Sequence, residues 1–268
     1  MKTMLIAALL ALGGPAPADA PLQPTGKWTV EYADAACILS RDYGDGQARR
    51  TLGFKPWPLG DALEIVTLSS GATTTRARSL KAQLLLQPSG QAIESTVAVY
   101  DVKARNQIVT TLRTEQDGAA AVQTSSALTI ASADGARTSF AVPGMKSAAA
   151  ALRACQDDLL KQWGVDPSER DKAPLPTPLT PMAGWITTDD YPSEALSAGS
   201  AGTTMMIWAI QPDGKVGDCR IIQSSGSKSL DLASCAAVTK RGRYAPPLGY
   251  DGKPTTVHAM RYVNWRLP

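Results

Sequence analysis

Few side chains in this sequence are arranged as an enzyme would need them. Ser225 and Lys228 match the Ser-x-x-Lys pattern of penicillin-binding acyl-enzymes, in which the lysine deprotonates the serine. The companion Ser-Asp-Asn and Lys-Thr-Gly elements are missing, and serines at a strand-to-helix turn are expected as helix caps. His258 is the only histidine, and no Gly-x-Ser-x-Gly elbow supplies it with a nucleophile. We therefore expect no catalytic residues and no enzymatic activity.

The sequence offers little to a metal ion or a cofactor. One histidine with scattered carboxylates makes a poor metal site, and without a Cys-x-x-Cys pair neither a zinc knuckle nor a thioredoxin-like redox site is indicated. The Gly/Asp loop at residues 42–46 could touch calcium, but a plain turn is the preferred interpretation. Since no glycine-rich phosphate loop occurs either, we expect no metal and no cofactor.

The four cysteines favour structural disulfides over catalysis. They are Cys37, Cys155, Cys219 and Cys235. An even number of cysteines in a secreted chain meets an oxidising environment in which disulfides persist. Their spacing suggests that Cys37 pairs with Cys155 and Cys219 with Cys235, although four cysteines allow three connectivities.

The first residues have the layout of a secretory signal peptide. Lys2 precedes an apolar run at residues 4–12, and a stretch rich in small residues follows. Cleavage after Ala18 is preferred, because cleavage after Ala20 would leave Pro21 at the new N-terminus. A retained membrane anchor is the alternative, but the run has only about half of the roughly twenty apolar residues that a membrane-spanning helix needs. We predict a signal peptide over residues 1–18 and no transmembrane anchor after its cleavage.

Composition is typical of an ordered, water-soluble chain that does not bind nucleic acid. Hydrophobic residues make up 44% of the sequence and charged residues 19%, and the net charge is +3. A nucleic-acid-binding protein of this length is usually far more basic. We interpret the clusters Arg49-Arg50 and Lys240-Arg241 as solvated faces.

A proline-rich segment divides the chain into two parts. Prolines at positions 174, 176, 178 and 181 indicate a stiff, extended spacer that excludes both helix and central strand. The predicted organisation is a β-rich N-terminal domain over residues 19–166, a proline-rich linker over 167–183, and a small C-terminal domain over 184–268.

The N-terminal part shows the pattern of a mostly antiparallel sandwich or open barrel closed by one helix. Short β-rich runs alternate with turn residues, at 28–32, 37–41, 63–68, 80–87, 96–102, 108–112, 128–131 and 139–142. An apolar stripe at helical spacing then runs from Met145 to Trp163, and Gly164 can end that helix. Cys155 lies on the stripe. No family resemblance is evident here.

The C-terminal part shows alternating helix and strand signals. Pro192 and Gly199 bracket a short helix, and Asp213-Gly214 marks a hairpin between strands at 203–210 and 215–223. Ser227 is the predicted N-cap of a helix that ends at about Lys240, with Asp231 in its first turn. A last strand is predicted from 255 to about 265.

The first of these strands is apolar on both faces. Thr204, Met206, Trp208 and Ile210 should face the helices, while Met205, Ile207 and Ala209 form an equally apolar opposite face. A sheet face left to solvent would normally alternate to polar residues. Either the N-terminal domain or a partner must cover this face, and we favour the N-terminal domain.

An ordered set of landmarks in this part resembles the C-terminal domain of the TonB energy transducers, over about residues 189–267. The landmarks are Tyr191-Pro192, Gly199 with Gly202, Asp213-Gly214, Val216, Ser224-Ser225-Gly226, Leu230-Asp231, Tyr244 with Pro246, and Gly252-Lys253-Pro254. The resemblance implies a three-stranded antiparallel sheet with two helices on one face, and so an α+β protein overall. It also implies that Cys219 lies on the middle strand and faces the helix that carries Cys235.

The resemblance implies a non-enzymatic function in the periplasm. In the family this domain binds an extended peptide of an outer-membrane TonB-dependent transporter, which adds a strand beside the domain's last strand. The implied protein-binding edge consists of Thr256, Val257, His258, Ala259, Met260, Arg261, Tyr262, Val263, Asn264 and Trp265. The alternative is a sheet strand with a capped edge and no binding role.

Two departures from the transducers favour binding over force transmission. The leader looks cleavable, and the spacer would reach only about 30 Å when fully extended. The predicted function is therefore that of a periplasmic TonB-like protein that binds an outer-membrane transporter or another envelope protein. The alternative is a ligand- or cell-wall-binding protein that uses the TonB-like module as an adaptor, and a homodimer is left open.

Overall fold

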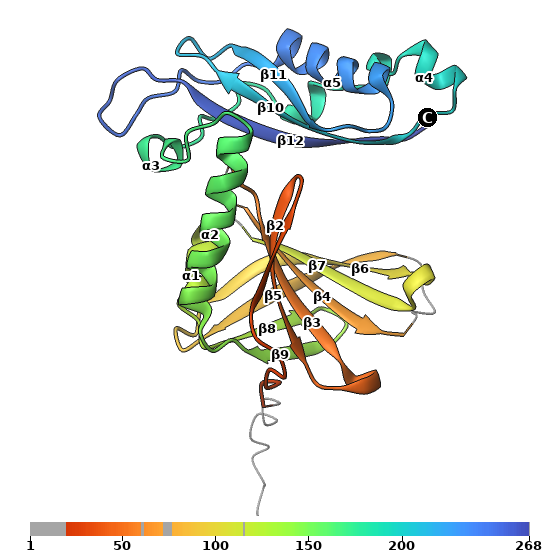
Figure 1. The fold of residues 1–268 in the computed structure, drawn as a ribbon, viewed down its shortest axis with the longest axis vertical. Coiled ribbons are helices and arrows are strands. Elements are labelled where there is room, and N and C mark those ends of the chain that lie inside the picture. The colour runs from red at the N-terminus through yellow and green to blue at the C-terminus, as the bar shows by residue number, and fades with distance from the viewer. Residues whose placement is uncertain (1–19, 60–61, 72–76, 115, 268) are drawn as a thin grey trace, which may run out of the picture.

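The computed structural model describes residues 20–59, 62–71, 77–114 and 116–267, which form two separate sheets (Figure 1). The predicted signal peptide, residues 1–18, lies outside the described residues. No helix within the described ranges has the length and apolar character needed to cross a membrane. The predicted α+β class is confirmed: a nine-stranded antiparallel half-barrel precedes a three-stranded antiparallel sheet.

The half-barrel is built mostly from neighbouring antiparallel strands. Its strands are β1 Thr29–Ala33, β2 Ala36–Tyr43, β3 Arg50–Pro56, β4 Leu63–Ser70, β5 Arg78–Gln87, β6 Ala92–Val102, β7 Gln107–Thr114, β8 Ala127–Ser132 and β9 Arg137–Ala141. Their spatial order is β1-β2-β3-β4-β7-β6-β5-β8-β9. Side chains that alternate toward the inner face, such as Leu52, Phe54 and Leu84, are almost fully buried, which is the burial pattern of a sheet with one covered face.

Helix α2, Met145–Gln162, covers this inner face beside β1 and β2. Its apolar stripe is buried in the same core as the sheet, and Cys155 is joined to Cys37 of β2 by a disulfide. The helix ends at Trp163, where Gly164 takes a left-handed φ of 70° that a residue with a side chain would rarely adopt. Both the predicted helix and this predicted disulfide are therefore present.

Two elements of the half-barrel escaped the sequence analysis. Strand β3 carries Gly53 and ends in Pro56, both of which are unfavourable in strands, yet its Leu52 and Phe54 are buried. Helix α1, Gln116–Gln123, contains Gly118, which lowers the helix preference of the segment. The helix is also too short to show a clear apolar stripe. In both cases contacts with the rest of the core outweigh weak local preference.

The C-terminal sheet has the spatial order β11-β10-β12, with two helices on one face. Its elements are α4 Ser193–Ser197, β10 Gly202–Ile210, β11 Val216–Gln223, α5 Lys228–Arg241 and β12 Val257–Trp265. A disulfide joins Cys219 of β11 to Cys235 of α5. The expectation that Cys219 lies on the middle strand was wrong, because β10 pairs with both neighbours and leaves β11 at an edge.

Strand β10 is buried on both faces. Met206, Trp208 and Ile210 pack beneath α5 together with Val238. On the other face, Met205 and Ile207 belong to the same buried cluster as the core of the half-barrel, and both are fully buried. The N-terminal part therefore covers the second apolar face, as favoured from the sequence.

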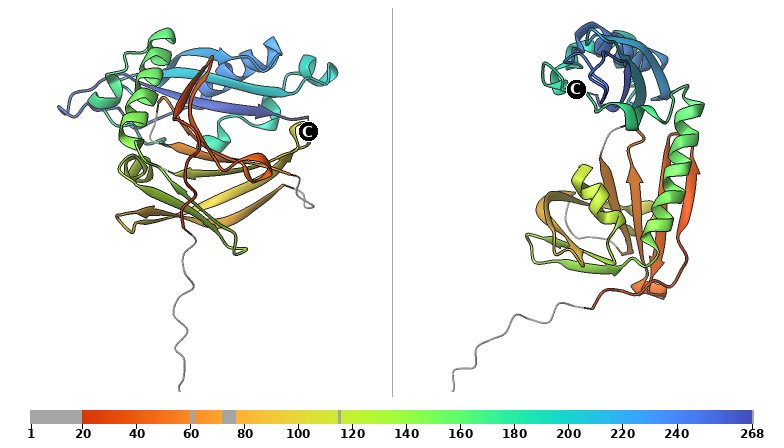
Figure 2. Two further views of the ribbon diagram at one scale, coloured as in Figure 1. Left: turned by 60° about the horizontal axis from the view of Figure 1, so that its bottom comes forward. Right: turned by 90° about the vertical axis from the view of Figure 1, so that its left-hand side faces the viewer.

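Polar and aromatic contacts surround this interface between the two parts. The ring of Trp57, which follows β3, meets the ring of Tyr262 edge to face at 5.5 Å between centroids. Lys55 Nζ lies 5.4 Å from the centre of the same tyrosine ring, and His258 Nδ1 lies 2.8 Å from Glu169 Oε2. Figure 2 shows the C-terminal sheet lying across one end of the half-barrel, with α2 running along the half-barrel toward that end.

The proline-rich segment is extended, but it packs against the C-terminal part. The short helix α3, Glu169–Lys172, precedes it. Leu179 N–H donates to the carbonyl of Arg243 at 2.9 Å, and Ala245 N–H donates to the carbonyl of Thr177 at 2.9 Å. The segment is thus held by main-chain hydrogen bonds along residues 243–245, which restricts its use as a free spacer.

Because β10 is buried on both faces, truncation of Ile207 should cause a large loss of stability. We expect Ile207→Ala to lower the free energy of unfolding by about 2–5 kcal/mol, because it leaves a cavity between the two parts. The matched control is Leu232→Ala on α5, whose residue is 61% exposed and whose truncation should change stability by no more than about 0.5 kcal/mol. Urea unfolding of both variants measures the difference, and equal losses would contradict the burial of this face.

Candidate protein-binding site

The candidate site is the outer edge of β12. This strand pairs antiparallel with β10 along its whole length, from Val257 opposite Ile210 to Trp265 opposite Gly202. Within the described residues no strand or isolated bridge pairs with its other edge. An edge strand presents unpaired N–H and C=O groups along that rim, to which an extended chain can bind.

Most side chains of the predicted edge are already used for packing. Those of Val257, Ala259, Val263 and Trp265 point toward the helices, and those of His258, Met260 and Tyr262 point toward the half-barrel. Thr256 immediately precedes the strand, and Asn264 is exposed. What remains available along this edge is the main chain, together with the side chain of Asn264 and the exposed part of Arg261.

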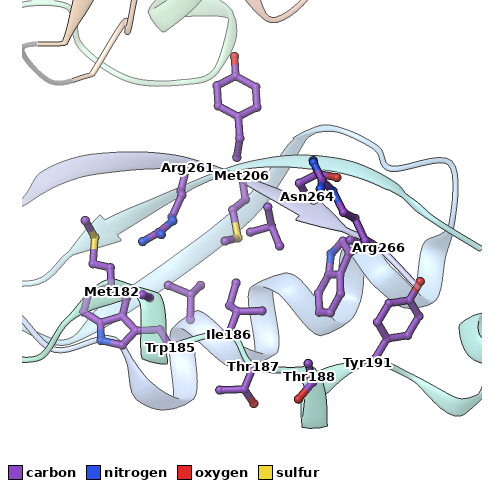
Figure 3. Close-up of a pocket in the computed structure, with 15 residues that line it drawn as sticks. Met182, Trp185, Ile186, Thr187, Thr188, Tyr191, Met206, Arg261, Asn264 and Arg266 are labelled. Atoms are coloured by element: carbon purple, nitrogen blue, oxygen red, sulfur yellow. The ribbon is translucent and has the colours of Figure 1, made fainter. Parts of the chain in front are cut away.

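A groove of about 500 Å³ lies beside this edge (Figure 3). One wall is residues 261–266, at the end of β12 and just beyond it, and the other is the segment 182–191. Met206 of β10 and Val238 of α5 also line the groove. Because segment 182–191 lies in the helix layer, a strand added to β12 would point every second side chain into this groove.

Aromatic pairs fix both ends of the groove. At one end the rings of Tyr191 and Trp265 meet edge to face at 5.3 Å, and Trp265 Nε1 donates to Ser234 Oγ at 3.0 Å. At the other end Trp185 meets Tyr244 edge to face at 5.2 Å. Edge-to-face ring pairs are favourable geometries, so the walls are preorganised rather than formed on binding.

The turn at residues 187–190 is held by a capping box and an ion pair. Thr187 and Asp190 exchange the two hydrogen bonds of the box. Arg241 of α5 donates to the Asp190 carboxylate and to the carbonyl of Trp185. The hydrogen bond from Arg241 lowers the pKa of Asp190 below its ordinary value. This carboxylate is therefore ionised and already paired.

Asp231 anchors α5 to the sheet. Its carboxylate accepts hydrogen bonds from Thr204 Oγ1 at 2.8 Å, Ser224 Oγ at 2.5 Å and Ser225 N–H at 2.9 Å. Burial alone would raise the pKa of Asp231, but these hydrogen bonds outweigh it and hold the pKa below the ordinary value. The ionised carboxylate thus ties β10 and the residues that follow β11 to the start of α5.

The Ser-x-x-Lys tetrapeptide lies at this junction and takes part in its hydrogen bonds. Ser225 Oγ is 2.8 Å from an oxygen of Asp231, and Lys228 is exposed. Ser227 occupies the N-cap position of α5 as predicted, but its side chain makes no capping hydrogen bond. Asp231 therefore organises the helix start, a role that the sequence analysis gave to Ser227.

The Gly/Asp loop at residues 42–46 holds two aspartates, and the first of them has its carboxylate engaged within the chain. Asp42 accepts hydrogen bonds from Arg49 Nη2 at 2.7 Å and from Thr51 Oγ1 at 2.6 Å. No group of three or more potential metal ligands occurs in the described part of the chain. We assign this loop a structural role.

Segment 182–191, the second wall of the groove, was not part of the predicted site. The sequence analysis divided it between the linker and the start of the C-terminal domain. A signal was present, because Trp185-Ile186 is a large apolar pair between the last proline of the spacer and the polar residues 187–190. Apolar residues outside a regular element indicate packing, but they do not identify which element they meet.

A small sheet with helices on one face and an open edge strand is an architecture to which an extended chain can add as a further strand. Residues 188–267 match the family model described as Gram-negative bacterial TonB protein C-terminal. This segment is therefore a TonB C-terminal domain, which confirms the resemblance. The match does not extend to the half-barrel. No curated protein and no solved structure matches the chain.

The hydrogen bonds to Asp231 predict that the stability difference between the wild type and Asp231→Asn depends on pH. Folding lowers the pKa of Asp231, so the ionised carboxylate stabilises the fold fully above its unfolded pKa of about 3.9. This stabilisation is lost as the pH falls through the folded pKa. We expect Asp231→Asn to lose roughly 1.5–3 kcal/mol at pH 7 and to approach the wild type below about pH 4. Glu194→Gln, at an exposed site on α4, is the control and should show no such convergence. Unfolding followed at several pH values measures both, and a pH-independent gap would contradict this role.

Proposed function

We propose that this protein is a periplasmic, non-enzymatic TonB-like protein that binds an extended segment of an outer-membrane TonB-dependent transporter by strand addition to β12. The observation that carries the proposal is the unpaired outer edge of β12 within a TonB C-terminal domain. In strand addition, main-chain hydrogen bonds supply affinity and side-chain pockets supply selectivity.

The groove supports strand addition because it lies where the inward side chains of an added strand would point. Its apolar surface comes from Ile186, Val263 and Trp265. The opposite sheet face is unavailable, since Met205 and Ile207 are buried against the half-barrel. Partner binding is therefore directed to the edge and to the helix-side groove.

We propose further that binding here is not coupled to force transmission through a long spacer. The proline-rich segment is hydrogen-bonded along residues 243–245, and the sheet is packed on the half-barrel. A transducer that crosses the periplasm needs a spacer that extends away from its terminal domain. The TonB C-terminal domain and the two disulfides are consistent with a location in the cell envelope, and we assign the protein to the periplasm.

Strand addition predicts an alternating response to N-methylation of the bound peptide. The full chain is titrated with a fluorescent peptide copied from the N-terminal extended segment of such a transporter, and with versions N-methylated at one residue each. Methyl groups on N–H groups that face β12 should weaken binding by roughly tenfold or more, while those on alternate residues should have little effect.

The matched controls are the two sets of methylated peptides themselves, which have the same composition. Equal affinity for both sets, or no binding of any peptide, would contradict strand addition. A second copy of this chain could instead pair with the edge of β12, and sedimentation of the free chain tests this alternative. A stable dimer that dissociates when peptide is added would assign β12 to dimerisation, and the transporter proposal would fail.

A further inference from the structure

A second cavity lies where the half-barrel, α2 and the C-terminal domain meet. Its volume is about 370 Å³, within the range of small-molecule sites, which often form where two parts of a protein join. Helices α1, α2 and α3 and the residues that follow β3 line it from the N-terminal side, and Val257, His258 and Tyr250 line it from the C-terminal domain. Figure 1 shows α3 beside the end of α2, near the C-terminal sheet. Among the described residues, this cavity and the groove beside β12 have no lining residue in common.

The lining of this junction cavity runs from buried to exposed residues. Leu59, Ala62 and Gln156 are buried, whereas Leu175 and Tyr250 are 43% and 70% exposed. The cavity is therefore open to solvent on one side and reaches inward between the two parts of the chain. A tyrosine ring as exposed as that of Tyr250, at the edge of a cavity, is available to contact a ligand.

Gln156 of α2 is a buried polar side chain of the cavity with unused hydrogen-bonding capacity. It is 8% exposed, and its Nε2 donates to the carbonyl of Trp57 at 3.4 Å, which is long for a hydrogen bond. No described residue donates to its amide oxygen. That oxygen keeps accessible surface, since the fully enclosed side-chain atoms without a partner in the described structure are Trp208 Nε1 and Arg261 Nη1. Because buried polar groups are nearly always hydrogen-bonded, the amide indicates a donor that enters the cavity.

The charged side chains that line the cavity are already paired within the chain. They form three acid–base pairs: Arg153 with Asp171, Arg170 with Asp157, and His258 with Glu169. A charged ligand would have to disrupt one of these pairs, which is costly where they are partly buried, whereas an uncharged ligand would leave them intact. The paired groups keep spare hydrogen-bonding capacity, because a guanidinium has five N–H donors and a carboxylate about four lone-pair sites. The cavity therefore favours an uncharged ligand with many hydrogen-bonding groups.

A neutral sugar has the chemistry that these features require. Its hydroxyl groups both donate and accept hydrogen bonds, so they can satisfy the Gln156 amide and the spare capacity of the paired side chains. The C–H groups of a sugar ring form an apolar face, which an aromatic ring attracts through its electron-rich face. Trp57 and Tyr250 supply aromatic rings at the cavity. A purely apolar ligand would instead leave the Gln156 amide without a partner.

We propose that the junction cavity is a binding site for a neutral mono- or disaccharide. A hydroxyl group of the sugar donates to the amide oxygen of Gln156, and a C–H face of the sugar packs against the ring of Tyr250. The proposal is independent of strand addition to β12, because the cavity and the groove are lined by different residues. It gives the protein a second, small-molecule binding function at the junction of its two parts.

Titration of the full chain with neutral and charged sugars tests this proposal. The neutral probes are glucose, galactose, mannose, N-acetylglucosamine, maltose and chitobiose, and the charged counterparts are glucosamine and glucuronic acid. Calorimetry should show that at least one neutral sugar binds with a Kd of about 1 mM or below. The charged counterparts should bind roughly tenfold or more weakly, because they compete with the existing acid–base pairs.

Two variants test the assigned contacts. Gln156→Leu should weaken sugar binding roughly tenfold or more, since it removes the amide at similar volume, and Tyr250→Ala should weaken it roughly two- to tenfold. The matched control is Tyr32→Ala on β1, whose residue is 59% exposed and lines neither the cavity nor the groove; it should bind as the wild type does.

The Tm of each variant shows whether a loss of binding comes from unfolding. If Gln156→Leu lowers the Tm strongly, Tyr250→Ala decides, because its exposed side chain contributes little to the fold. The inference is overturned if no neutral sugar binds, if charged sugars bind as tightly as neutral ones, or if both variants bind sugar as the wild type does. Peptide binding at β12 is unaffected by any of these outcomes, so the proposed function stands or fails by its own test.

Discussion

The burial of both faces of β10 is the constraint on which the rest of the structure depends. The residues Met205 to Ile210 alternate between two separate cores, one beneath α5 and one shared with the half-barrel. With one sheet face exposed to solvent, this small domain would have little stability by itself, because so short a chain buries little apolar surface. Here the half-barrel and α2 provide the missing layer, so the C-terminal sheet depends on both parts of the chain.

The sheet has two edges, β11 and β12, and the edge of β12 is the one with a groove beside it among the described residues. The face toward the half-barrel is closed, and α5 covers much of the other, tied to β11 by the disulfide between Cys219 and Cys235. The outer rim of β12 and the groove beside it remain open. Both are held by neighbours that are already hydrogen-bonded or stacked, which keeps the ordering cost of binding low.

Much of this fold could be predicted because its signals are local. The apolar stripe from Met145 to Trp163 specified α2 and its end at Gly164, and Asp213-Gly214 specified the hairpin between β10 and β11. The apolar residues on both faces of β10 indicated that a second layer must cover the C-terminal sheet. Local signals failed where glycine and proline reduce strand and helix preference, as in β3, and in α1 with its Gly118. There, tertiary contacts alone determine the element.

By itself the sequence predicted a last strand from 255 to about 265, observed at Val257–Trp265, and a TonB-like domain over about residues 189–267. The tertiary structure decided which edge of that strand is free, because strand order depends on long-range pairing and leaves no trace in local periodicity. It also brought segment 182–191 beside β12 to make the groove. Neither the free edge nor the groove could be predicted locally, since both are formed by neighbours that are distant in the sequence.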